Sequence, residues 1–177
     1  MRRLLVPALI MLTACSSGDE PSLSQPSPTP TDLQFRVISE EQNATFCVEG
    51  PEFAVAATED EWVDIYSRQS DCQPGGDFSL PNARFTHPSR PEVVLAAWWK
   101  VEGCLGYDVE TQSVQRVGPE VVVRATSTGP GEGQACATAL GSLESFLAVP
   151  EDALDGAAVV RFFLNDEQLG SVDLSDG

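Results

Sequence analysis

Residues 91–104 read PEVVLAAWWKVEGC, and the stretch from Val93 to Trp99 within them decides the fold. Seven consecutive apolar residues leave no polar face, which is typical of a central β-strand covered on both sides. Successive side chains of a strand point to opposite faces, so Trp98 and Trp99 must point in opposite directions. At most one of them could serve an exposed binding surface, whereas two covered faces would bury both. The stretch therefore predicts a sheet with a packed layer on each side.

Further segments rich in β-branched and aromatic residues, bounded by Gly, Pro, Asn or Asp, lie on both sides of this strand. Gly118-Pro119 is expected to turn one hairpin, and residues 165–168 to close the last one. The expected class is α+β, a mostly antiparallel sheet of meander or sandwich form with one packed helix and disulfide staples. The predicted strands are 35–39, 53–57, 93–101, 106–114, 121–126, 146–149, 158–164 and 169–174.

The clearest helix signal is the segment TEDEW, which begins at Thr58. Thr58 suits the N-cap position, and Glu61, three residues on, can complete a capping box. Acidic residues in this turn also suit the helix dipole. An apolar stripe then recurs at helical spacing up to about Arg68, which predicts that one face packs against the sheet. The stripe consists of Trp62, Ile65 and Tyr66.

The N-terminus carries the pattern of a bacterial lipoprotein signal peptide. Two arginines precede the apolar run from Leu4 to Leu12, and the tetrapeptide LTAC then ends at Cys15. The run is shorter than the roughly 20 residues that span a bilayer. We expect residues 1–14 to be the signal peptide and Cys15 to carry the lipid, against the alternative of a secretory signal cleaved elsewhere.

Residues 15–32 are predicted to be the lipidated cysteine and a disordered tether. The stretch is rich in Ser, Pro and Thr and has no aromatic residue, so it cannot bury enough surface to fold. Its prolines favour extended chain of about 3 Å per residue. O-linked sugars on such a stalk are an open alternative. The lipoprotein signal predicts anchoring on the extracytoplasmic face of the cell envelope. Ser16, rather than Asp, follows Cys15, which favours the outer membrane if the host has one.

Residues 33–177 have the length of one acidic, β-rich globular domain, and no repeat or second linker divides them. The chain has a net charge of −17, and losing Arg2 and Arg3 with the signal removes two positive charges and leaves −19. Such a charge repels nucleic acid and anionic headgroups. We therefore expect no nucleic-acid partner, whereas a cationic partner remains open.

Four further cysteines in an exported chain predict two disulfides, formed by Cys47, Cys72, Cys104 and Cys136. Three pairings are possible. Pairing Cys47 with Cys72 and Cys104 with Cys136 is favoured because each bond would close a moderate loop, and each would add about 3 kcal/mol in the chain-entropy model. The zinc alternative has no CxxC pair and only one His to help, so we expect no metal and no cofactor.

The sequence has few candidates for catalytic groups. It contains no GxSxG, HExxH, phosphate-cradling Gly loop or DxDxDG calcium loop. The single His, His87, precedes Pro88 in an expected loop, and Lys100 is the single Lys, which leaves little to activate a nucleophile. A carboxylate pair stays open, but no spacing singles out an acid and a base. We expect no enzyme activity. The acceptor pattern Asn43-Ala44-Thr45 is treated as chance in a bacterial lipoprotein.

Several motifs between Trp62 and Pro150 occur together in one known family. They are the aromatic-anchored helix, the segment PEVVLAAWWKVEGCLGYDVETQSVQRVGPEVVVRAT (91–126), a Gly/Pro-rich loop with Cys136, and LESFLAVP (143–150). In this order they resemble the C-terminal domain family of PrcB, a protein that stabilises a bacterial surface protease complex. Gly106-Tyr107 and Val149-Pro150 stand where that family has a Gly-Tyr pair and a closing Val-Pro.

Cys104 is a departure, since other members often carry Thr or Gly there, and it could add a disulfide to the same sheet. The resemblance implies a protein-interaction or complex-stabilising module without chemistry of its own, partnered by an envelope protein. It carries no binding residue across to this sequence. A lipoprotein that captures a small molecule or a cation is the open alternative.

Overall fold

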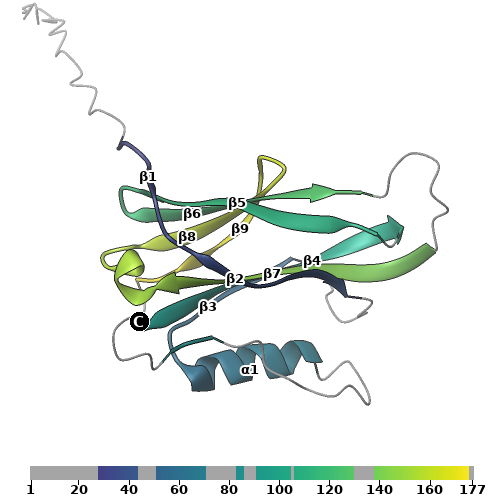
Figure 1. The fold of residues 1–177 in the computed structure, drawn as a ribbon, viewed down its shortest axis with the longest axis horizontal. Coiled ribbons are helices and arrows are strands. Elements are labelled where there is room, and N and C mark those ends of the chain that lie inside the picture. The colour runs from purple at the N-terminus through teal and green to yellow at the C-terminus, as the bar shows by residue number, and fades with distance from the viewer. Residues whose placement is uncertain are drawn as a thin grey trace, which may run out of the picture.

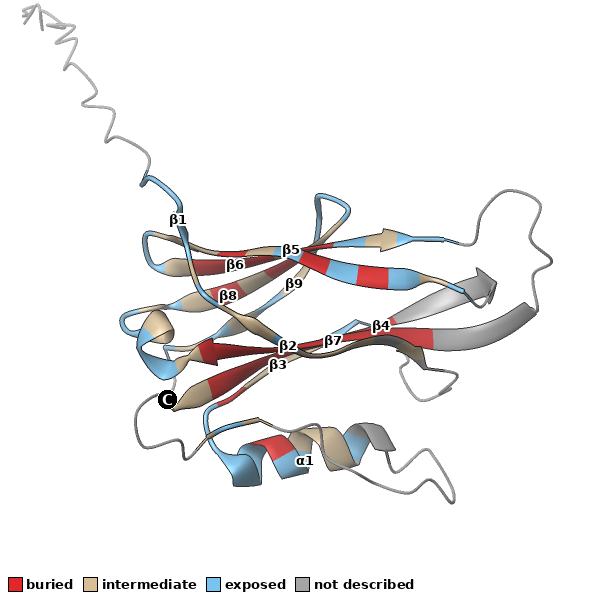
Figure 2. Ribbon diagram, viewed as in Figure 1, coloured by how far each residue is buried: buried red, intermediate tan, exposed pale blue. Residues whose placement is uncertain are grey.

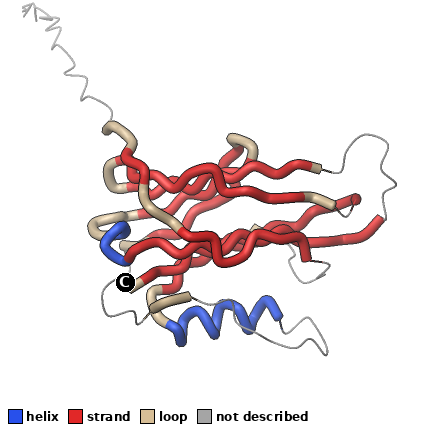
Figure 3. The backbone as a smooth tube through the Cα atoms, viewed as in Figure 1, coloured by secondary structure: helices blue, strands red, loops and turns tan. Residues whose placement is uncertain are grey.

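The computed structural model describes residues 28–43, 51–70, 83–85, 91–104, 106–129 and 138–175. Within these residues, two β-sheets pack face to face, and helix α1 (Glu59–Ser70) covers the outer face of one of them (Figure 1). The rest of the described structure is almost entirely strand, with a short 3-10 helix, η1 (Glu151–Leu154), at one end (Figure 3). None of the helices in these ranges has the length and apolarity needed to cross a membrane.

The five-stranded sheet has the order β1-β5-β6-β8-β9. Its strands are antiparallel except for β6 and β8, which run parallel. The bounds are β1 (Thr31–Asp32), β5 (Asp108–Val117), β6 (Glu120–Thr128), β8 (Val159–Leu164) and β9 (Glu167–Asp173).

The four-stranded sheet has the order β2-β7-β4-β3 and is antiparallel throughout. Its bounds are β2 (Arg36–Asn43), β7 (Thr138–Pro150), β4 (Glu92–Cys104) and β3 (Glu52–Ala56). The mostly antiparallel α+β class is thus confirmed, in its sandwich form. A meander is wrong, because β4 and β5 follow one another in the chain but belong to different sheets. In the chain, β7 comes after β6 and before β8, but it belongs to the four-stranded sheet. The chain thus crosses to the other sheet and returns, and this is the crossover connection that the parallel pairing of β6 and β8 needs.

β4 is the central strand that its sequence predicts. The side chains of Val93, Leu95, Ala97 and Trp99 enter the core between the sheets, and those of Val94, Ala96 and Trp98 enter a second core under α1. Figure 2 shows this strand buried along that part of its length. Trp98 is 3% exposed and Trp99 is 8% exposed, so neither belongs to an exposed binding surface.

The predicted helix is confirmed, with its capping box. The N–H of Glu61 donates to Thr58 Oγ1, and the N–H of Thr58 donates to Glu61 Oε2, both at 3.2 Å. Trp62 is 1% exposed and packs against Trp98 and Phe146, with ring centroids 6.4 and 5.2 Å away. The aromatic stripe therefore holds α1 on the four-stranded sheet.

Both expected hairpin turns are present. Gly118 has φ of 60°, and Asn165 and Asp166 have φ of 50° and 67°, the left-handed conformations that tight hairpin turns favour. Three elements are absent from the prediction, namely β1, η1 and the first half of β7. That half of β7 includes Ser142, Glu144 and Ser145. These residues are buried, but their polarity gives no sequence signal of a buried strand. β1 falls within the predicted tether and pairs with β5.

Candidate interaction site

The sandwich has two sides where edge strands of the two sheets meet, and the side between β2 and β5 is closed by side chains. Gln42 Oε1 accepts the N–H groups of Gly106 and Tyr107 at 2.6 and 2.9 Å. Glu40 Oε1 accepts the N–H of Thr111 at 2.8 Å. β1 pairs only with Arg116 and Gln115 of β5, so these two β2 side chains bond the part of the β5 edge that β1 does not reach.

A buried polar contact continues this closure into the core. The hydroxyls of Thr111 and Ser145 lie 3.1 Å apart and are both buried, and Ser145 Oγ donates to Glu40 Oε1 at 3.4 Å. Thr111 stands at a bulge in β5, where the pairing with β6 skips a residue. Alternate N–H groups of an edge strand point outward, and β1 does not reach Thr111, so the N–H of Thr111 donates to β2 of the other sheet.

The opposite side, between β3 and β9, is held by aromatic packing. The ring of Phe53 in β3 stacks on Phe162, with centroids 4.9 Å apart and planes 26° from parallel. The same ring lies over Gly170 of β9, where a Cβ would overlap it. No backbone pairing joins β3 to β9, since each is the last strand of its own sheet.

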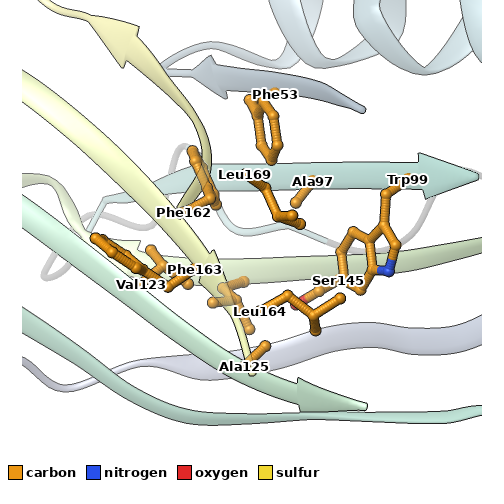
Figure 4. Close-up of a pocket in the computed structure, with 11 residues that line it drawn as sticks. Phe53, Ala97, Trp99, Val123, Ala125, Ser145, Phe162, Phe163, Leu164 and Leu169 are labelled. Atoms are coloured by element: carbon orange, nitrogen blue, oxygen red, sulfur yellow. The ribbon is translucent and has the colours of Figure 1, made fainter. Parts of the chain in front are cut away.

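An apolar pocket lies between the sheets beside these rings (Figure 4). Phe53 and Leu169 line it from the two edge strands, and Trp99 and Ser145 line it from β4 and β7. It has room for about one water molecule, far less than a typical small-molecule site. The Nε1–H of Trp99 is buried and has no hydrogen-bond partner among the described residues.

The outer face of the five-stranded sheet is covered by its own side chains. Arg161 pairs with Glu120 at 2.9 Å, and the Arg124 guanidinium lies 4.5 Å from the centre of the Phe163 ring. Val122, in the middle of this face, is only 7% exposed. The face is therefore polar and offers no broad apolar patch to a partner.

Two further polar clusters hold the four-stranded sheet together. Glu92 accepts from Arg36 Nη2 at 2.6 Å and from the N–H of Arg84 at 3.1 Å. Burial alone raises the pKa of the Glu92 carboxyl, but the hydrogen bonds and charges of Arg36 and Arg84 outweigh it, so the pKa is lowered. On the same sheet, Ser39 Oγ donates to the buried carboxylate of Glu144 at 2.9 Å.

Most residues that the sequence singled out fall outside the described ranges. Cys15, Cys47, Cys72, Cys136 and His87 do so, and the lipid attachment and the disulfides remain predictions. Cys104 is the last residue of β4, where its backbone lies opposite Thr138, and Lys100 lies opposite Ser142 in the same ladder. Across the described ranges, no group of three or more His, Cys, Asp or Glu residues could hold a metal ion.

The residues that shape the two sides were not predicted. Glu40 and Gln42 alternate with other polar residues in β2, and only the position of β5 in the other sheet gives them their role. Phe53 is predicted as a strand residue, but nothing in the sequence predicts that Gly170 is its partner. A Gly inside a strand pattern, as in Leu169-Gly170-Ser171, often marks a close approach, and it is the one sequence cue to this contact.

Comparison with known proteins finds no matching family model, no matching curated protein and no matching solved structure.

Proposed function

We propose that this chain is a lipid-anchored extracytoplasmic protein whose sandwich domain is a non-catalytic protein-interaction or complex-stabilising module. The observation that carries the proposal is the difference between the two sides of the sandwich. Glu40 and Gln42 close the β5 edge, whereas among the described residues no strand pairs with the outer edge of β3. An edge strand with free backbone groups is a common place for a partner to bind.

Sequence features support the same role. The signal pattern ending at Cys15 and the Ser/Pro/Thr tether favour a domain held at a membrane surface. The resemblance of residues 62–150 to the PrcB C-terminal domain family implies a module that stabilises another protein. The strong negative charge favours a partner with a cationic surface over nucleic acid.

The test is affinity capture of the tagged, lipidated chain from cross-linked and detergent-solubilised envelopes. Cys15→Ala is the matched control, because it removes the lipid site and leaves the domain sequence unchanged. We expect one envelope protein to co-purify in stoichiometric amount above that control. A chain that comes out alone in both samples, or that turns over an envelope substrate with a requirement for His87, would contradict the proposal.

Binding of a small molecule or a cation is the competing function. It predicts that the ligand raises the melting temperature of the domain, because selective binding to the folded state stabilises it. Thermal scans with a set of divalent cations and small apolar compounds measure this directly. We expect no shift, since the apolar pocket at Trp99 has room for about one water molecule, and no group of three or more His, Cys, Asp or Glu among the described residues could hold a metal ion.

A further inference from the structure

We propose that β3 accepts an extended strand from a partner protein, which joins the four-stranded sheet as a fifth strand. The inference rests on the proposed interaction function and assigns it a surface and a type of ligand. β3 runs over Glu52–Ala56 at the end of the sheet, with β4 on one side and, in the described part of the chain, no strand on the other. Its backbone is therefore available for pairing along one edge.

The direction of the β4 peptide groups follows from a single hydrogen bond. The N–H of Glu151 donates to the carbonyl of Pro91 at 3.0 Å, at the start of the β4–β7 ladder. In an antiparallel ladder the residues of a strand face their two neighbours alternately, and this ladder has no bulge. The odd-numbered residues of β4 therefore bond to β7, and the even-numbered ones bond to β3. The N–H of Glu92, which donates to Arg84 away from β7, agrees with this alternation.

The free groups of β3 follow in the same way. Ala54 and Ala56 lie opposite the even-numbered residues 96 and 94, so their peptide groups bond to β4. The N–H and C=O groups of Phe53 and Val55 then point to the open edge. Among the described residues, these outward groups have no hydrogen-bond partner. The next outward N–H along the chain, that of Ala57, donates to Glu61 Oε2 at 2.8 Å.

The other edges of the sandwich carry features that oppose strand addition. β1 is two residues long, and Glu40 and Gln42 bond the rest of the β5 edge. β2 contains a bulge and charged residues, and β9 contains a bulge, Gly170 and an acidic residue at each end. Such features are those by which proteins block edge-to-edge pairing. β3 has the sequence EFAVA, with no bulge, proline or lysine.

The surroundings of the edge indicate the chemistry of the partner strand. Phe53 lies toward the core beside Leu169, and the apolar pocket between the sheets begins there, so side chains of an added strand that face inward should be apolar and small. Exposed acids stand at the start of β3 and of two elements that contact it, namely Glu52 in β3, Glu59 in α1 and Glu167 in β9. A partner segment with alternating apolar residues and Lys or Arg at its ends fits this surface.

Amide hydrogen exchange of the mature chain, residues 15–177, tests the premise. We expect the amides of Phe53 and Val55 to exchange at least about tenfold faster than those of Ala54 and Ala56, because only the latter pair is bonded to β4. Equal protection of all four amides would overturn the assignment of the open edge.

Titration with a synthetic peptide tests the ligand. The probe has the sequence KKVTVTVKK, and the control is the same peptide with N-methyl groups on alternate residues, which removes backbone donors without changing charge. We expect the probe to slow exchange at Phe53 and Val55, and the control peptide to leave it unchanged. Protection that maps to β9, or that the N-methylated peptide also gives, would overturn the proposal, as would no protection at millimolar peptide.

Charge reversal separates the edge from the general acidity of the protein. Glu52→Lys with Glu59→Lys should weaken binding of the probe about tenfold, and the matched reversal of Glu110, exposed on β5, with Asp108 should change it less than twofold. An equal loss in both double variants would mean non-specific attraction. If envelope capture recovers a partner whose binding leaves exchange at Phe53 and Val55 unchanged, the interaction function stands and the β3 site is wrong.

Discussion

The ring of Phe53 occupies the space that a side chain at Gly170 would need, so β3 and β9 approach each other only because position 170 has no Cβ. The contact links the last strands of the two sheets and places Phe53 on Phe162. This side of the sandwich is thus held by packing of the Phe53 ring, whereas hydrogen bonds of Glu40 and Gln42 join the opposite side.

Gly170→Ala is therefore expected to destabilise the domain by about 1–3 kcal/mol, because the added methyl group forces the Phe53 ring or β9 to move. Urea unfolding at neutral pH measures the change. Ser171→Ala, next to it and exposed, serves as the control and should stay within about 0.5 kcal/mol. Equal stability of both variants would mean that β9 adjusts without cost.

Trp62→Ala should cost about 3–5 kcal/mol, since it removes a fully buried ring that contacts Trp98 and Phe146. Trp62→Phe keeps an aromatic ring and should lower the free energy of unfolding by less. Val63→Ala is the matched control on the same helix, because Val63 is 40% exposed. Unfolding followed by tryptophan fluorescence and circular dichroism measures these changes, and a loss at Val63 equal to that at Trp62 would place α1 in a different orientation.

Acid should weaken the contact of Glu92 with Arg36 and Arg84. The folded-state pKa of Glu92 is lowered, so its contribution to stability is complete above the ordinary pKa of 4.5 and is lost as the pH falls through the folded-state value. Glu92→Gln should cost roughly 1 kcal/mol at pH 7 and less at pH 3. The test is the unfolding free energy of both proteins across this pH range. A difference between them that grows toward acid pH would contradict the prediction.

Gln42→Ala should free the N–H groups of Gly106 and Tyr107 and speed their hydrogen exchange, with a stability loss of about 1 kcal/mol. Glu40→Ala should do the same for the N–H of Thr111. Gln112→Ala, an exposed position on β5, is the control and should change neither quantity. If the exchange rates of these amides stay as they are in the unchanged protein, β2 does not close the β5 edge in solution.

Much of the local structure could be predicted because its causes are local. The apolar run of β4, the Thr58 and Glu61 cap and the turn at Asn165-Asp166 each carry their own physical signal. The assignment of each strand to one of the two sheets could not be predicted, because alternation of side chains says which face is buried and nothing about which strands pair. The parallel pairing of β6 with β8 has the same origin.

The candidate site was harder to predict than the fold. Its components are a row of free peptide groups on Phe53 and Val55 and two polar side chains on β2, and none of these is a motif. They acquire meaning only from the strand order, which leaves β3 at an end and places β2 beside β5. The expected start of the domain, at residue 33, lies two residues after the first residue of β1. β1 forms in the last two residues of the expected tether because the edge of β5 pairs with them.

β1 also has a mechanical consequence. Two residue pairs join it to β5, and the N–H of Leu33 adds a bond to the carbonyl of Val114 at 2.8 Å. A pulling force applied at the N-terminal end of the chain would reach these few bonds before it reached either core. Their release would lengthen the chain by roughly 3.5 Å for each residue freed, while both sheets stayed folded. Under such a force these bonds would break first, and the strands of the two sheets would bear the load only after this slack was taken up.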